Sequence, residues 1–178
     1  MRKRLLWLIG SMFLCCGCFP YVTAHGQQSE ARLAVGSTPS PSPVDFTIDI
    51  TLSDRAKKKL TESKETVIVA AYLSGTAKKG ALKRYAHDGE VGLGDIDIET
   101  APGESAKFKD VKPKEDAFRQ TDKQSPQILI NVFSGRKSSK DNLIICDIYE
   151  GTLESIRQRI LPISCALIEE HPILHTVK

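Results

Sequence analysis

A strict alternation of apolar and polar side chains is the sequence feature that most restricts what this chain can fold into. In "DFTIDITLS", residues 45–53, apolar side chains occupy every second position from Phe46 to Leu52. Successive side chains of a strand point to opposite faces, so this segment is predicted to be a strand with one buried face. Such a strand needs a second layer of structure to cover its apolar side.

Further short apolar segments at close spacing predict a mainly β domain. "TVIVAAYLS", residues 66–74, is apolar on both faces and predicts a central strand, and "LPISCALI", residues 161–168, predicts a closing strand. Two hairpins are expected: residues 94–111, turning at Pro102-Gly103, and residues 127–134 paired with residues 142–151. We therefore predict a small two-sheet β-sandwich, transthyretin-like or immunoglobulin-like by analogy.

Two segments predict short helices beside these strands. "SDRAKKKLTES", residues 53–63, offers Ser53 as an N-cap, and Ala56 and Leu60 lie four positions apart on one face. "TLESIRQR", residues 152–159, predicts a short helix or turn that leads into the closing strand.

The beginning of the chain is typical of an exported protein. A basic start, "MRKR", precedes the uncharged residues 5–18, and Val22-Thr23-Ala24 fits a signal-peptidase site. We predict a secretory signal peptide at residues 1–24, a Ser/Pro-rich linker at 25–43, one sandwich domain at 44–171 and a loose tail at 172–178. The mature protein is expected to be periplasmic or secreted.

A second way of processing stays open. Gly17-Cys18 resembles the lipobox of bacterial lipoproteins, which implies lipidation at Cys18 and a membrane-tethered lipoprotein of an envelope assembly. An uncleaved signal would also place the chain at a membrane. In either case residues 25–43 would serve as the tether.

Export changes the interpretation of the cysteines. Three of the five, Cys15, Cys16 and Cys18, lie in the signal segment, which leaves Cys146 and Cys165 in the domain. Each alternates with apolar residues in its strand, Cys146 between Ile144 and Ile148, so both are expected to face the core. An even pair in an exported chain predicts a disulfide bond.

Charge excludes one class of partner and indicates another. Removing three signal residues from 25 Lys+Arg leaves 22, against 22 Asp+Glu, so the mature chain is formally neutral and nucleic acid is not an expected partner. Basic residues are nevertheless clustered on the helix (Arg55, Lys57, Lys58, Lys59) and in two loops. The partner-binding candidates in the loops are Lys78, Lys79, Lys83, Arg84, Arg136, Lys137 and Lys140. The alternative is a solubilising role that also protects strand edges.

The acidic stretch of residues 88–99 is predicted to be a strand's outer face. Asp95, Asp97 and Glu99 alternate with isoleucines and lack calcium-loop spacing. His87 stands beside no recognisable nucleophile. The sequence therefore predicts no metal, no cofactor and no catalytic residue.

These observations favour a non-catalytic binding or adaptor protein of the cell envelope. Its partner would be another envelope protein or an anionic polymer, bound by residues 74–84 and 134–141 at one end of the sandwich. The alternative is an inhibitor of a wall hydrolase. Ser74-Gly75 and Ser134-Gly135 open loops that resemble those which bacterial lysozyme inhibitors insert into an enzyme cleft.

The mature N-terminus is expected to be His25, because Val22-Thr23-Ala24 follows the helix-breaking Pro20. Intact mass spectrometry of the exported protein tests this. A mass that fits an acylated chain starting at Cys18 would contradict it and favour the lipoprotein.

Overall fold

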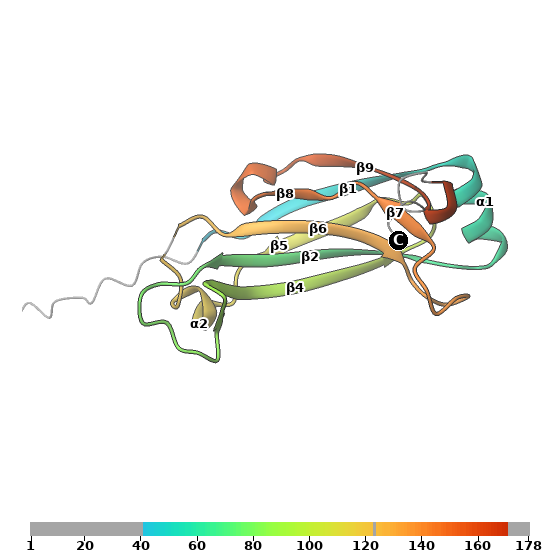
Figure 1. Cartoon of the computed structure of the whole chain (residues 1–178). Coiled ribbons are helices and arrows are strands. Elements are labelled where there is room, and N and C mark those ends of the chain that lie inside the picture. The colour runs from blue at the N-terminus through green and yellow to red at the C-terminus, as the bar shows by residue number, and fades with distance from the viewer. Residues whose placement is uncertain (1–40, 123, 171–178) are drawn as a thin grey trace, which may run out of the picture. The chain divides into compact units, whose positions relative to one another are not determined.

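The described part of the chain, residues 41–122 and 124–170 of a computed structural model, forms a sandwich of two β-sheets (Figure 1). The first sheet has the strand order β5-β1-β9-β7, and the second has the order β3-β4-β2-β6-β8. The strands are β1 (Val44–Leu52), β2 (Val67–Thr76), β3 (Ala86–His87), β4 (Glu90–Thr100), β5 (Ala106–Val111), β6 (Gln127–Ser134), β7 (Ile144–Cys146), β8 (Tyr149–Thr152) and β9 (Ile160–Leu167). Two short α-helices, α1 (Asp54–Glu62) and α2 (Glu115–Phe118), accompany them, so the predicted fold class is confirmed.

Several predicted features lie outside the described residues. These are the signal segment with Cys18, the linker up to residue 40, and the chain from residue 171 onward. Among the residues that are described, no helix has both the length and the apolar character needed to cross a membrane.

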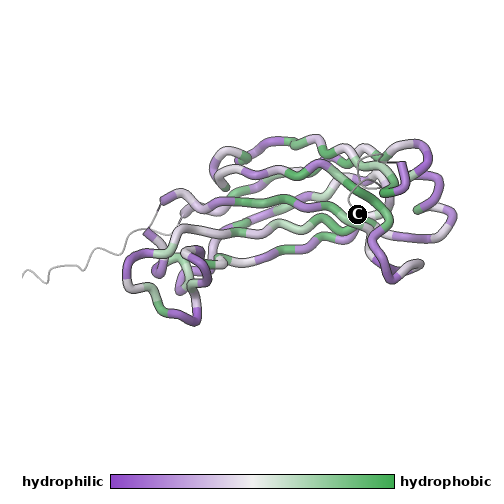
Figure 2. The backbone as a smooth tube through the Cα atoms, viewed as in Figure 1, coloured by the Kyte–Doolittle hydropathy of each residue, from purple (hydrophilic) through white to green (hydrophobic). Residues whose placement is uncertain are grey.

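The core lies between the two sheets, and β1 shows how its sequence fills it. Phe46, Ile48 and Ile50 are buried, whereas Asp49 and Thr51 between and beyond them are exposed. The ring of Phe46 stacks on that of Phe108 in β5, with centroids 4.6 Å apart. Figure 2 shows the resulting alternation of hydrophobic and hydrophilic residues along the strands.

Helix α1 follows the sequence prediction closely. The Ser53 hydroxyl accepts a hydrogen bond from the backbone N–H of Ala56 at 3.0 Å, which caps the N-terminus. Ala56 and Leu60 are the buried residues of the helix, and its lysines are exposed. A thin apolar stripe is therefore enough to hold α1 on the sandwich.

Strand β2 is central, as predicted, because β4 pairs with one of its edges and β6 with the other. Val67, Val69 and Ala71 point into the core. On the outer face Ile68 is half-buried, while Tyr72 keeps 40% of its surface exposed.

The first predicted hairpin is wrong, although its turn is right. Gly103 has a φ of 85°, as the third position of a type II turn requires, and the N–H of Glu104 bonds to the carbonyl of Ala101. The chain nevertheless changes sheet at this turn: β4 pairs with β2 and β3, whereas β5 pairs with β1. A turn reverses direction, but the partner of each strand is set by which layer receives its apolar side chains.

The second predicted pair is correct for only half of its length. Strand β6 pairs with β8, whereas β7 pairs with β9 in the other sheet. The chain crosses between the layers at Asp147 and Ile148. Ile148, expected to face inward, is therefore 62% exposed.

The predicted disulfide is present between Cys146 and Cys165. The two residues face each other across the antiparallel pair β7–β9, with their Cα atoms 4.0 Å apart. Cys165 is buried, and Cys146 is half-buried beside it. The bond fixes β7 on β9 next to the crossing into β8, and it is compatible with an exported protein.

Loss of this disulfide is expected to lower the free energy of unfolding. The cross-link joins residues 19 positions apart, which corresponds to about 3 kcal/mol in the chain-entropy model. Urea unfolding of the parent with and without reductant measures it, and the Cys146→Ser, Cys165→Ser double variant serves as control. A reductant effect of equal size in the double variant would show that the disulfide is not its cause.

Candidate functional site

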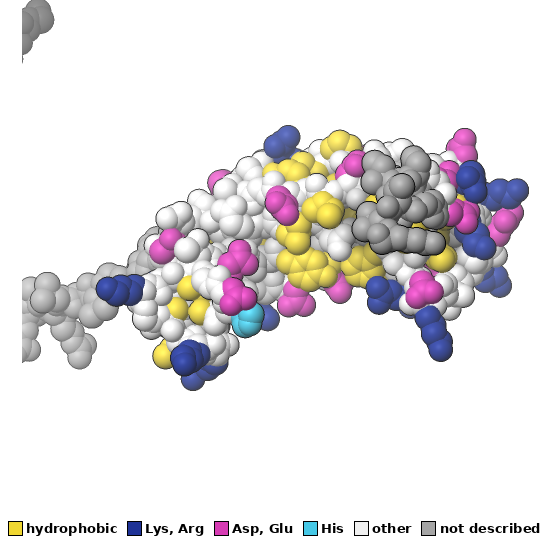
Figure 3. Space-filling view, viewed as in Figure 1, with side chains coloured by type: hydrophobic (Ala, Val, Ile, Leu, Met, Phe, Trp, Pro, Cys, Tyr) yellow, Lys and Arg dark blue, Asp and Glu magenta, His cyan; other side chains and the backbone are white. Residues whose placement is uncertain are grey.

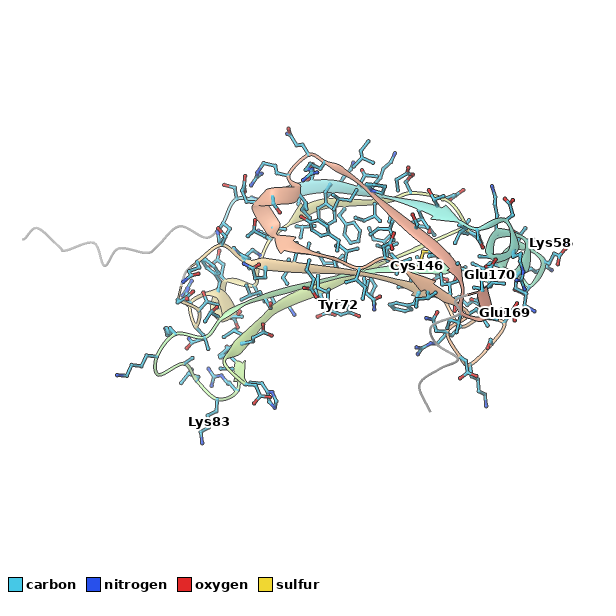
Figure 4. The ribbon with its side chains drawn as sticks, turned by 45° about the horizontal axis from the view of Figure 1, so that its top comes forward. Lys58, Tyr72, Lys83, Cys146, Glu169 and Glu170 are labelled. Atoms are coloured by element: carbon cyan, nitrogen blue, oxygen red, sulfur yellow. A yellow bond between two sulfur atoms is a disulfide. The ribbon has the colours of Figure 1, made fainter. Side chains whose placement is uncertain are left out.

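The two predicted binding loops lie at opposite ends of the sandwich, so the expectation that they share one end was wrong. Strands β2 and β6 are antiparallel, with Val67 facing Ser134 and Ser74 facing Gln127. One loop leaves the end of β2 and the other leaves the end of β6, so about 23 Å of strand separates them. Figure 4 shows Lys83 of the first loop at one end and Lys58 of α1 at the other.

In the second loop, residues 135–143, the predicted cations contact the protein's own surface. The ammonium of Lys137 lies 3.0 Å from the carboxylate of Glu99. The guanidinium of Arg136 lies over the ring of Phe133, 6.0 Å from its centroid. Both contacts are on the outer face of the five-stranded sheet, which leaves Lys140 as the predicted cation of this loop with neither an ion pair nor an aromatic contact among the described residues.

A buried carboxylate holds the backbone of this loop in place. Glu65 is 2% exposed and accepts hydrogen bonds from the N–H groups of Thr66, Lys137 and Ser138 and from the Ser138 hydroxyl, all between 2.6 and 3.0 Å. Burial alone raises its pKa, but these four donors outweigh burial and lower the pKa from 4.5 to about 2. Glu65 is therefore an ionised structural anchor.

Neither Ser-Gly pair lies at a protruding tip. Ser74 and Gly75 are part of β2, where a Cβ on Gly75 would come within 2.9 Å of the Thr121 side chain. Ser134 is fully buried, and its hydroxyl bonds to the Asn142 side chain. These positions serve packing rather than contact with another molecule.

The first loop, residues 77–85, is compact and tied to the segment that follows α2. Ala77 forms a β-bridge with Thr121, and the N–H of Lys78 bonds to the carbonyl of Gln120 at 2.9 Å. The loop backbone then makes two tight turns, in which the N–H of Ala81 bonds to the carbonyl of Lys78 and that of Tyr85 bonds to the carbonyl of Leu82. The loop is therefore a well-defined platform for its side chains.

None of the cations of this loop makes an ion pair within the described residues. The Lys78 ammonium donates to the carbonyl of Arg119, and Arg84 lies over the ring of Tyr85 at 5.0 Å. Lys79 and Lys83 are exposed and make no ion pair or side-chain hydrogen bond within the described residues. Figure 3 shows Lys or Arg side chains gathered at the tip of this end, beside exposed hydrophobic atoms.

Three acids near the loop make contacts of their own, whereas Glu90 at the start of β4 is exposed and makes no ion pair or side-chain hydrogen bond within the described residues. The Asp116 carboxylate accepts a bond from the Tyr85 hydroxyl at 2.9 Å, and this bond is the main cause of its lowered pKa. Glu115 pairs with Arg119 at 3.1 Å, and Asp88 lies 3.0 Å from His87. These acids do not neutralise Lys79 or Lys83 through direct contact.

The acidic stretch lies where the sequence predicted. Asp95, Asp97 and Glu99 are exposed along β4, and Ile96 and Ile98 between them are half-buried. In residues 41–122 and 124–170, no group of three or more His, Cys, Asp or Glu side chains is placed to hold a metal ion. The His87 side chain is 93% exposed.

One further basic surface was not predicted from the sequence. Lys107, Lys109 and Arg159 line an open depression of about 180 Å³ on the outer side of β1 and β5, together with Asp45. The alternation in "AKFKDV" indicates that both lysines share a face, but the approach of Arg159 depends on the pairing of β1 with β9. Asp45 offsets part of the charge there, and its carboxylate bonds to the N–H of Asp110.

Comparison with known proteins adds no functional information: no family model, no curated protein and no solved structure matches the chain.

Stability is expected to depend on Glu65 at low pH. Its folded pKa lies below its unfolded value of 4.5, so its contribution is present above pH 4.5 and is lost as the pH falls towards 2. Above pH 4.5, Glu65 is expected to contribute about 3 kcal/mol to the free energy of unfolding. Glu65→Gln should remove it, because an amide places N–H donors against the donors of the loop.

Urea unfolding of the parent and of Glu65→Gln between neutral pH and pH 2 measures this contribution. The difference in free energy of unfolding between the parent and Glu65→Gln should be largest near neutral pH and shrink below pH 4.5. Glu62→Gln, on the exposed face of α1, is the matched control and should behave like the parent. A parent and a Glu65→Gln variant with parallel pH profiles would contradict the role of Glu65.

Proposed function

We propose that this protein is an exported, non-catalytic binding module of the cell envelope that engages an anionic partner through the loop of residues 77–85. The observation that carries the proposal is the charge of this loop. Lys78, Lys79, Lys83 and Arg84 fall within seven residues that contain no acid. The loop projects from a rigid sandwich, which is where such domains usually hold their recognition residues.

The contrast with the other end supports this choice of loop. There Lys137 and Arg136 contact the protein itself, Arg55 of α1 pairs with Glu169 at 3.1 Å, and Lys57 and Lys59, unpaired among the described residues, share their helix with Asp54 and Glu62. Cations with intramolecular partners must give up those contacts before they bind another molecule. Lys79 and Lys83 have no such contacts to lose among the described residues.

A binding role rather than catalysis accords with the state of the reactive side chains. Cys146 and Cys165 are oxidised in the disulfide, so neither thiol is available as a nucleophile. His87 is exposed on a short edge strand, and its ring contacts Asp88 rather than a hydroxyl or thiol. The placement of both Ser-Gly pairs inside the fold gives no support to the inhibitor alternative.

Charge reversal in the loop tests the proposal. Lys79→Glu combined with Lys83→Glu is expected to weaken binding to a soluble polyanion, inorganic polyphosphate, roughly ten-fold, because two exposed attractions become repulsions. The affinity of the parent should also fall as salt is added, since exposed charges are screened within about 8 Å at physiological ionic strength. Fluorescence anisotropy of labelled polyphosphate measures both effects.

The matched control is Lys57→Glu combined with Lys59→Glu on the exposed face of α1, at the opposite end. It makes the same change in net charge and should retain most of the binding. Both variants should keep the parent's melting temperature, since all four lysines are exposed. Equal losses in the two variants would show that binding follows net charge alone and would contradict a loop-specific site.

A further inference from the structure

The basic loop carries an exposed apolar side chain at its tip. Leu82 is 47% exposed and lies between Ala81 and Lys83. Its backbone is fixed: its N–H bonds to the side chain of Gln120, and its carbonyl accepts bonds from the N–H groups of Tyr85 and Ala86. The position of Leu82 is therefore set by the loop, although its side chain finds no place in the core.

An apolar tip among cations fits one kind of anionic surface better than others. A soluble polyanion offers charge but no apolar phase to receive a leucine. An anionic bilayer offers phosphate groups at the level of the lysines and hydrocarbon beneath them. Lysine and arginine stems also lie along such a boundary with their charges in the headgroup region.

The start of the domain lies at the same end as this loop. Val44, the first residue of β1, pairs with Val111 at the end of β5, and the chain then continues into α2. Asp116 of α2 bonds to Tyr85 of the loop, and Figure 1 shows α2 and the beginning of β1 at the same end. A membrane anchor before residue 41 would therefore be connected to the domain at the end that holds the basic loop.

We propose that residues 78–84 dock the protein on anionic phospholipid membranes, with Leu82 entering the interface and Lys79, Lys83 and Arg84 contacting lipid phosphates. This inference rests on the proposed function, because it names the partner of the same loop. Binding through one loop is weak and reversible. A protein anchored at its N-terminus would gain from it a second contact that fixes its orientation.

Vesicle co-sedimentation of the processed, disulfide-bonded protein tests this proposal. Vesicles of phosphatidylcholine with and without phosphatidylglycerol are compared, and all variants share the same N-terminus, so differences between them report on the loop. The parent should bind the vesicles that contain phosphatidylglycerol more tightly than the vesicles of phosphatidylcholine alone. Lys79→Gln with Lys83→Gln should weaken that binding about 25-fold, at about five-fold for each cation.

Substitution of Leu82 distinguishes binding to a bilayer from binding to a soluble anion. Leu82→Ser should weaken binding to phosphatidylglycerol vesicles about ten-fold and leave binding to polyphosphate unchanged. Ile148→Ser is the matched control, since Ile148 is an exposed apolar residue outside the loop at 62% exposure, and it should bind both like the parent.

Two results would overturn the membrane proposal in different ways. Polyphosphate binding that depends on Lys79 and Lys83, with no effect of Leu82→Ser on vesicles, would leave the proposed function standing and replace the membrane by a soluble anionic partner. If substitution of the loop lysines changed binding neither to polyphosphate nor to vesicles, both proposals would be contradicted.

Discussion

The antiparallel pairing of β2 with β6 is the constraint on which the functional geometry of this protein depends. The register that places Val67 opposite Ser134 also places Ser74 opposite Gln127. Each strand delivers its loop to a different end, and the pleat sends Val69 and Val132 into the core together. A shift of the register by one residue would turn these valines outward, so the positions of the loops are fixed by the packing of the core.

Core packing explains why the sequence predicts some elements well and others poorly. The face of β1, the cap of α1, the central place of β2 and the disulfide all follow from local alternation, spacing and cysteine number. Pairing partners do not. The segments around Pro102-Gly103 and around Ile148 both change sheet, because periodicity does not tell which layer a strand joins, and at Ile148 the crossing between sheets also ends the predicted alternation.

In the candidate site, too, some features can be predicted from the sequence and others depend on how the strands pair. The sequence identifies the basic residues of both loops, since clusters of Lys and Arg are visible in the chain itself. It does not show that Lys137 meets Glu99, 38 positions earlier, or that Glu65 anchors the backbone of Lys137 and Ser138. Those contacts arise only after β2, β4 and β6 have paired. Long-range contacts therefore decide which of the predicted cations remain free.

The predicted mature chain is formally neutral, but a neutral chain can still present a directed electric field if its charges are distributed unevenly between its two ends. At the α1 end, Arg55 and Lys137 pair with Glu169 and Glu99, and Lys57 and Lys59, unpaired among the described residues, share their helix with Asp54 and Glu62. At the other end, Lys79 and Lys83 lie in the seven-residue segment 78–84, which contains no acid. The local field then depends on where the charges of each sign lie and not only on their sum. Such a field orients the domain as it approaches an anionic surface, and an exposed leucine beside the unpaired lysines makes a bilayer the surface that fits it best.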